Sequence, residues 1–155
     1  MSKFLAIVDP WEKPLAHDDA KFPFLASDID VQCKLIYNQL SRLKPLFGDI
    51  IVVNSGVKSH PVFDGLPNYF GLIDKKNDWD VWLCGFHYGR CIHAKIENAM
   101  NEFGWSPNRF NIIENLSFLF PGDTKETMVK NARCRQAILD TKEYYWDFEK
   151  RLYEL

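Results

Sequence analysis

Three side chains of this 155-residue sequence, Asp9, Lys58 and Cys91, are of the types that carry out acyl transfer. A cysteine thiolate is a strong nucleophile, and both a helix N-terminus and a nearby cation lower the pKa of its thiol. A carboxylate can take the thiol proton and return it to a leaving group. We therefore expect Cys91 to be the nucleophile, Asp9 the general acid and base, and Lys58 or Arg90 the cation beside the thiol.

Each of these side chains follows a segment that reads as a buried strand. The apolar runs span 4–8, 50–53 and 80–86, and they lead into Asp9, Asn54 and the turn before Cys91. Continuous apolar runs of this length are typical of parallel strands that are covered on both faces. Because ligands bind at the carboxyl ends of parallel strands, the three ends predict one site at one edge of a sheet.

Strands and helices alternate along the rest of the chain. A fourth strand is predicted at 110–113. Helices are predicted at 27–47 with Ser27 as N-cap, at 66–76, from near Gly89 to Cys91 up to Gly104, and from Asp123 or Thr124 to the C-terminus. This order favours right-handed crossovers and a mostly parallel sheet. The prediction is one α/β domain over 1–155 with an open, mostly parallel sheet.

The loop at 10–27 is long and aromatic, which is typical of an ordered lid and not of a linker. Trp11 and Phe24 from this loop are expected to wall a small-molecule pocket together with Tyr88, because such pockets are mostly apolar. Asn54 at the second strand end and His87 in the turn before Cys91 are the polar candidates. Backbone N–H groups near Cys91 and His87 could hold an oxyanion.

Each candidate residue also has an ordinary structural interpretation. Cys91 could be a small buried hydrophobe, Asp9 could cap a turn before Pro10, and Lys58 could be a solvated surface charge. His60 and His87 could be metal ligands or proton carriers, but their spacing to other donors is not that of a metal site. Cys33, Cys84 and Cys134 are expected to pack in the core as reduced thiols. No cofactor or metal is expected.

The charge and hydrophobicity of the sequence argue against two classes of function, nucleic-acid binding and membrane insertion. The net charge is −2 with no long run of one sign, unlike the basic surface of a nucleic-acid binder. No segment approaches the roughly 18 apolar residues of a membrane helix, and the apolar run at 4–8 is too short for a signal peptide. We therefore expect a cytoplasmic protein that neither binds nucleic acid nor enters a membrane. The aromatic residues at 144–153 exceed the need of one helix face and could meet a second subunit.

Two segments resemble the isochorismatase-like, or nicotinamidase-type, cysteine hydrolases. Ala6-Ile7-Val8-Asp9-Pro10 is similar to the family's first strand and its catalytic aspartate. Residues 81–94, VWLCGFHYGRCIHA, look like the strand, turn and helix that hold the nucleophile. The helix that ends at Gly104 and the strand at 110–113 look like the helix and strand that come next in the family.

The resemblance implies a Rossmann-like, three-layer α/β/α fold with an open, mostly parallel sheet, an Asp-Lys-Cys triad and a cis peptide bond at Phe86–His87. Asp9 and Cys91 carry over directly, and Lys58 is the candidate lysine. The family usually has two strands between the first helix and the cysteine strand, with the lysine after the later one, whereas this sequence shows one clear strand there. Lys75 and Lys76 are poor substitutes. His87, Tyr88 and Gly89 stand where the family commonly has Ala-Thr and a polar residue.

Two functions are thus predicted, and a third lacks support. The first is hydrolysis of an amide or related C–N bond of a small molecule through a thioester on Cys91. The alternative is a catalytically inactive binding or interaction protein on the same fold, since fold does not fix function. A nucleotide-binding module is not supported, because no Gly-x-Gly-x-x-Gly follows the first strand.

Overall fold

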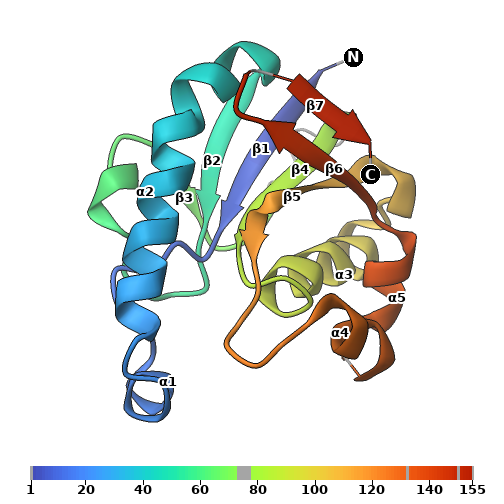
Figure 1. Ribbon diagram of the computed structural model, residues 1–155. Coiled ribbons are helices and arrows are strands. Elements are labelled where there is room, and N and C mark those ends of the chain that lie inside the picture. Colours follow the sequence, from blue (N-terminus) through green and yellow to red (C-terminus); the bar gives the residue numbers. More distant parts are fainter. Residues whose placement is uncertain (1, 73–77, 132, 150, 155) are drawn as a thin grey trace.

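Figure 1 shows the computed structural model, which describes residues 2–72, 78–131, 133–149 and 151–154. Its strands form one sheet in the order β3-β2-β1-β4-β5-β6-β7. The strands are β1 (Lys3–Val8), β2 (Asp49–Val53), β3 (Asn68–Tyr69), β4 (Asp80–Phe86), β5 (Phe110–Phe118), β6 (Lys142–Asp147) and β7 (Arg151–Glu154). All neighbours are parallel except β6 and β7, which pair antiparallel. The predicted open, mostly parallel α/β sheet is confirmed.

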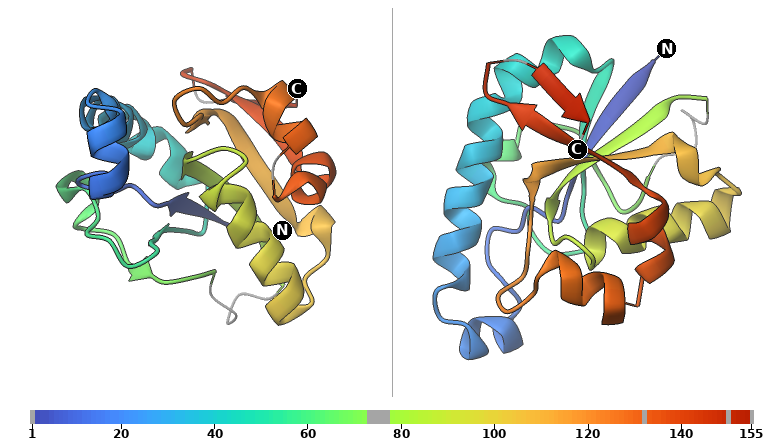
Figure 2. Two further views of the ribbon diagram at one scale, coloured as in Figure 1. Left: turned by 90° about the horizontal axis from the view of Figure 1, so that it is seen from below. Right: turned by 45° about the vertical axis from the view of Figure 1, so that its right-hand side comes forward.

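Helices cover both faces of this sheet. They are α1 (Ala16–Lys21), α2 (Leu25–Leu43), α3 (Cys91–Phe103), α4 (Lys125–Asn131) and α5 (Arg135–Asp140). The view from below shows α2 on one side of the sheet and α3 on the other (Figure 2). Within the described residues, no helix combines the length and the apolar character that a membrane span requires.

The central strand β1 is apolar throughout because both of its faces are buried. Leu5 and Ile7 belong to the core under α2, whereas Phe4, Ala6 and Val8 belong to the core under α3. Alternate residues of a strand point to opposite faces, so a strand between two helical layers needs apolar residues at every position.

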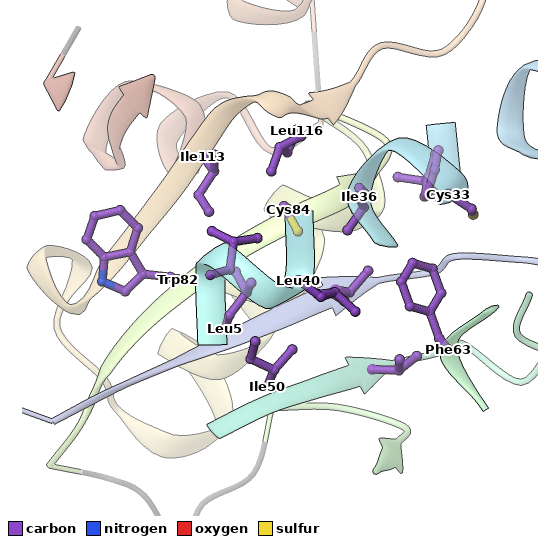
Figure 3. Close-up of a cluster of buried hydrophobic side chains, with 14 of the residues drawn as sticks. Leu5, Cys33, Ile36, Leu40, Ile50, Phe63, Trp82, Cys84, Ile113 and Leu116 are labelled. Carbon is purple, nitrogen blue, oxygen red and sulfur yellow. The ribbon is translucent and has the colours of Figure 1, made fainter. Parts of the chain in front are cut away.

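The core under α2 draws on several strands at once. Leu5, Ile50, Trp82 and Ile113 come from four adjacent strands and gather with Leu40 of α2 (Figure 3). The buried positions of α2 recur at the helical spacing that the sequence shows: Ile29, Cys33, Ile36, Leu40 and Leu43. This packing fixes α2 over the sheet and sets its first turn beside the carboxyl ends of the strands.

The prediction of a long helix at the C-terminus was wrong. After the short helices α4 and α5, the chain forms the hairpin β6–β7. Trp146 is fully buried and donates from Nε1 to Gln39 Oε1 of α2 (3.0 Å), whereas its neighbour Tyr145 is exposed. This alternation has the period of a strand, and aromatic residues favour strands.

The predicted helix at 66–76 was also wrong where the structure describes it. Residues 67–69 instead extend the sheet: Val52 N–H donates to the Pro67 carbonyl, and Asn54 N–H donates to the Tyr69 carbonyl. Two strands, β2 and β3, therefore lie between α2 and the cysteine strand β4. Pro67 and Gly71 are poor helix formers, and the free edge of β2 supplies hydrogen bonds to this segment. Residues 73–77 lie outside the described part of the chain.

The predicted start of the first long helix was two residues late. α2 begins at Leu25, so Ser27 lies inside the helix and is not its N-cap. The segment predicted as a loop at 10–27 also contains α1. The nucleophile helix was predicted correctly, since α3 begins at Cys91 and ends at Gly104 in the left-handed conformation (φ 67°).

Candidate active site

Asp9 lies at the end of β1, where the chain turns sharply. Its φ of 47° is uncommon for a residue other than glycine, and it is 2% exposed. Its Oδ1 accepts from the Ser55 N–H group (2.8 Å) and its Oδ2 from the Ser55 hydroxyl (3.1 Å). The Asp9 N–H group donates to the Val53 carbonyl (2.8 Å). The end of β2 therefore holds the Asp9 carboxylate in place.

The end of β4 approaches β1 closely enough to bring the cysteine turn beside Asp9. A Cβ atom on Gly85, whose φ is 112°, would lie 2.5 Å from the Val8 carbonyl oxygen. Only glycine fits there. The peptide bond between the next two residues, Phe86 and His87, is cis, as the family resemblance implies.

Cys91 is the first residue of α3, and its thiol meets the Asp9 carboxylate. Burial raises the pKa of this thiol to about 12, with further contributions from the negative charge of Asp9 and from a hydrogen bond to it. The cations Lys95 and Arg90 lower the pKa by smaller amounts. The structure thus brings together the acid and the sulfur, but the thiol is protonated at neutral pH and not activated in advance as the sequence suggested.

A cavity of about 210 Å³ opens beside Cys91. Its lining is mostly apolar and comes from the loop after β1, the first turns of α2, the cysteine turn and the segment after β5: Trp11, Pro14, Leu15, Asp18, Leu25, Ile29, His87, Arg90, Cys91 and Phe120. Cys91 and Arg90 also border a wider cavity of about 640 Å³ that extends toward α4 and contains Cys134.

His87 is neutral in this cavity at physiological pH. Burial lowers the pKa of its imidazole to about 4, and the positive charge of Arg90 adds to that effect. The ring meets Phe86 and Phe120 edge-on, at centroid distances of 5.3 and 5.2 Å. An imidazole in such surroundings can accept or donate one hydrogen bond without carrying charge.

The guanidinium group of Arg90 cannot bind a substrate anion with all of its N–H groups. Its Nε and Nη2 donate to the two carboxylate oxygens of Asp123, at 2.7 and 3.0 Å. Its guanidinium also lies over the Phe120 ring, 4.5 Å from the centroid. This arrangement connects the cysteine turn to the segment after β5 and leaves little uncompensated positive charge at the cavity.

Lys58 does not join Asp9 and Cys91. Its side chain is 75% exposed and its Nζ pairs with Glu12 Oε2 at 3.3 Å. The loop containing Lys58 is tied to the chain after β1, because Glu12 N–H donates to the Lys58 carbonyl. Lys58 is also not among the charges that shift the pKa of the Cys91 thiol. The other lysines considered, Lys75 and Lys76, lie outside the described residues.

The remaining predicted pocket residues divide between sites. Trp11 and His87 line the cavity at Cys91, as expected, but Phe24 is 53% exposed and does not. Asn54 lines another cavity with Lys58, and its amide donates to the Ser59 hydroxyl (2.6 Å). Tyr88 is buried on the opposite side of the cysteine turn.

His60 has a structural role, because it connects its own loop to Asp30 of α2. Its Nδ1 accepts from the Val62 N–H group, so its Nε2 carries the proton and donates to Asp30 Oδ1 (2.7 Å). Cys33, Cys84 and Cys134 are buried, as predicted, and all four cysteines are free thiols. Among the residues that the structure describes, no group of three potential ligands is placed to hold a metal ion.

Sequence reasoning missed three residues that shape the site. Ser55 holds Asp9, and its position directly after the Asn54 strand end was a usable signal. Lys95 is four residues after Cys91, a spacing that puts two side chains on one face of a helix. Leu25 also lines the cavity, but the predicted helix began at residue 27 and so left Leu25 out.

No protein-family model matches this chain, and neither the curated proteins nor the solved structures contain a significant match to it.

Proposed function

We propose that this protein is a cysteine hydrolase of the isochorismatase-like type, which cleaves an amide or related C–N bond of a small molecule. The observation that carries this proposal is the contact between the Asp9 carboxylate and the Cys91 thiol at the carboxyl edge of the sheet. A nucleophile and a base within hydrogen-bonding reach of each other are the signature of covalent catalysis. The cavity beside Cys91 provides room for a substrate.

In this mechanism the Asp9 carboxylate removes the thiol proton while Sγ attacks the substrate carbonyl carbon. The tetrahedral adduct then expels the amine, which takes the proton back from Asp9, and a thioester remains on Cys91. Water, deprotonated by Asp9, attacks the thioester and releases the carboxylic acid and the thiol. A thiol with a pKa of about 12 suits this order of events, because deprotonation coupled to attack avoids a free thiolate.

Backbone N–H groups of the cysteine turn are suited to hold the oxyanion. Those of Tyr88, Gly89 and Arg90 already donate to Phe118 O, His93 Nδ1 and His87 O. Among the described residues, no acceptor is found for the N–H groups of Cys91 and His87. Two donors held in a fixed turn stabilise the charge that develops on the carbonyl oxygen.

The lining favours a small, uncharged substrate with an apolar part. The cavity is small and mostly apolar, His87 is neutral, and Asp123 compensates Arg90. Trp11 adds a specific donor: its indole Nε1 is buried and has no hydrogen-bond partner within the described residues. A substrate carbonyl or ring nitrogen that accepts from this group would satisfy it.

Acylation by p-nitrophenyl acetate tests the nucleophile with a generic acyl donor in place of the substrate. We expect the intact protein to gain one acetyl group at Cys91, the Cys91→Ala variant to gain none, and the Asp9→Asn variant to react at least tenfold more slowly. Ammonia release from a panel of small primary amides then tests turnover. Acetylation that is unchanged in Cys91→Ala would sink the proposal.

The alternative is a binding protein that has lost catalysis on the same fold. The position of Lys58 favours it, because the family's triad lysine would stabilise both Asp9 and the thiolate, whereas Lys58 pairs with Glu12 in solvent. This alternative predicts saturable binding of a small uncharged molecule in the Cys91 cavity without acetylation or ammonia release.

A further inference from the structure

Tyr88 occupies the side of the cysteine turn that faces away from the Cys91 cavity. Its side chain is buried, and it does not line that cavity. Its N–H group donates to the Phe118 carbonyl at the end of β5 (2.9 Å). Its ring packs with Met128 of α4 and Ile138 of α5 in a small core of its own. The residue in the middle of the turn is therefore held from behind by three other elements.

The hydroxyl end of Tyr88 meets a network of charged side chains. Burial, a hydrogen bond to Glu143 and the negative charge of Glu143 raise the pKa of the Tyr88 hydroxyl. Lys125 of α4 binds Glu143 Oε2 on β6 (3.0 Å) and Glu114 Oε1 on β5 (3.1 Å). Its Nζ also lies over the Tyr88 ring, 5.1 Å from the centroid. One ammonium group thus connects β5 and β6 to the cysteine turn.

The first turn of α3 lacks the usual means of fixing its position. The side chain of an N-cap residue commonly bonds the first N–H groups of a helix, but Arg90, the N-cap of α3, makes no such bond. The neighbouring Gly89 is instead held by its surroundings. Its N–H group donates to His93 Nδ1 (2.8 Å), and an added Cβ would lie 2.7 Å from Met128 Cε. The backbone that leads into Cys91 therefore takes its position from the elements packed behind it.

The charged network does not act on the thiol directly. Neither Lys125 nor Glu143 is among the groups that shift the pKa of the Cys91 thiol. An effect of the network on catalysis must therefore come through the position of the turn and not through the thiolate fraction. The two effects are separable, because alkylation of a thiol needs only the thiolate, whereas acyl transfer also needs donors for the oxyanion.

We propose that Tyr88 is a positioning residue: held by Lys125 and Glu143, it fixes the cysteine turn so that the backbone N–H group of Cys91 meets the oxyanion of an acyl substrate. This inference rests on the proposed hydrolysis, because the oxyanion forms only in acyl transfer. It gives Tyr88 a place behind the turn, in contrast to the place in the pocket wall that the sequence suggested.

Two reactions of Cys91 test the proposal in Tyr88→Phe, which keeps the ring but removes the hydroxyl. Acetylation by p-nitrophenyl acetate should slow about tenfold, because a misplaced donor loses part of the oxyanion stabilisation. Alkylation by iodoacetamide should be nearly unchanged, because the network does not set the thiolate fraction. Tyr145→Phe, a matched change at an exposed position of β6, should leave both rates unchanged.

Variants of Lys125 test the network from a side chain that is 38% exposed, so they serve even where Tyr88→Phe fails to fold. Lys125→Met removes the ammonium group and should slow acetylation about fivefold without slowing alkylation. Lys125→Arg keeps the charge and should keep most of the acetylation rate. Lys130→Met, a matched change on the same helix, removes an exposed lysine that pairs with Glu126 and should leave both rates unchanged.

The outcomes separate this inference from the proposed hydrolysis. Acetylation that is unchanged in both Tyr88→Phe and Lys125→Met would overturn the positioning role while the hydrolysis stands. Equal slowing of acetylation and alkylation would do the same, because it would show a general loss of structure. An unmodified protein that is not acetylated at Cys91 would overturn the hydrolysis, and the positioning role with it.

Discussion

The backbone of Gly85 faces the backbone of Val8 with no room for a side chain between them. A Cβ atom on Gly85 would lie 2.5 Å from the Val8 carbonyl oxygen and 2.8 Å from its nitrogen. Asp9 follows Val8 directly, and the cysteine turn follows Gly85 after one residue. The close approach of these two strands therefore sets the distance between the acid and the thiol.

Replacing Gly85 with alanine should destabilise the protein and separate the two groups. The new methyl group meets backbone, which cannot move away as a side chain could, and the φ of 112° is strained for alanine. We expect a loss of about 3 kcal/mol in the free energy of unfolding, measured by urea denaturation. Gly65→Ala is the matched control, since nothing lies within 4 Å of its added Cβ. Equal stability of the two variants would contradict the role of Gly85.

Removing the Asp9 charge should change Cys91 alkylation and Cys91 catalysis in opposite directions. The Asp9 carboxylate raises the thiol pKa, so Asp9→Asn lowers it, although burial keeps it above the ordinary value. At any pH from 7 to 9 more thiolate is then present, and iodoacetamide should label Cys91 faster. Acetyl transfer from p-nitrophenyl acetate should slow, because the base is gone.

Mass spectrometry of the labelled peptide separates Cys91 from the buried Cys33 and Cys84. In the unmodified protein the alkylation rate of Cys91 should rise with pH up to 10 without a plateau, because the thiol pKa is about 12. A plateau near pH 7 would show that the thiol is activated before substrate binds and that Asp9 does not hold its proton.

The cations that act on Cys91 should be those of its own helix and turn. Lys95 lowers the thiol pKa and donates to the Phe70 carbonyl at 3.1 Å. Lys95→Gln should therefore slow iodoacetamide labelling of Cys91 by about twofold, the modest effect of a partly exposed charge. Lys58→Gln, the matched control, should leave the labelling rate unchanged. If Lys58→Gln slowed labelling of Cys91 more than Lys95→Gln does, Lys58 would have to act on the thiol and this assignment would be wrong.

Acid should destabilise the fold through two buried imidazoles. Burial lowers the pKa of both His87 and His93 to about 4, below the value of about 6.5 in the unfolded chain. The unfolded state then binds more protons below pH 6.5, so stability is present above that pH and is lost as the pH falls toward 4. Each histidine should lower the free energy of unfolding by about 2 kcal/mol between pH 7 and pH 5.

His93→Gln tests this pH dependence at one of the two positions. His93 is fully buried and its Nδ1 accepts from the Gly89 N–H group (2.8 Å), an acceptor that the glutamine side chain can replace. The difference in unfolding free energy between pH 7 and pH 5 should shrink by about 2 kcal/mol in this variant. His17→Gln, an exposed control on α1, should leave that difference unchanged.

The sequence alone determined the parts of the fold that depend on local pattern. The largely apolar segments at 4–8, 50–53 and 80–86 predicted buried strands, because a strand that is covered on both faces is apolar at nearly every position. Alternation with helices then made the sheet parallel. Parallel order placed the ends of three strands at one edge, and this is why the strand pattern was enough to pair Asp9 with Cys91.

Tertiary structure alone decided what depends on distant partners. Segment 67–69 pairs with the edge of β2, and the aromatic residues around Trp146 form strands because one of them fits under α2 at Gln39. The pattern of a short polar segment cannot show such a partner. The same holds for Lys58: the sequence shows its place in the chain, but only the fold turns its ammonium group toward Glu12 in solvent and buries the Cys91 thiol against Asp9.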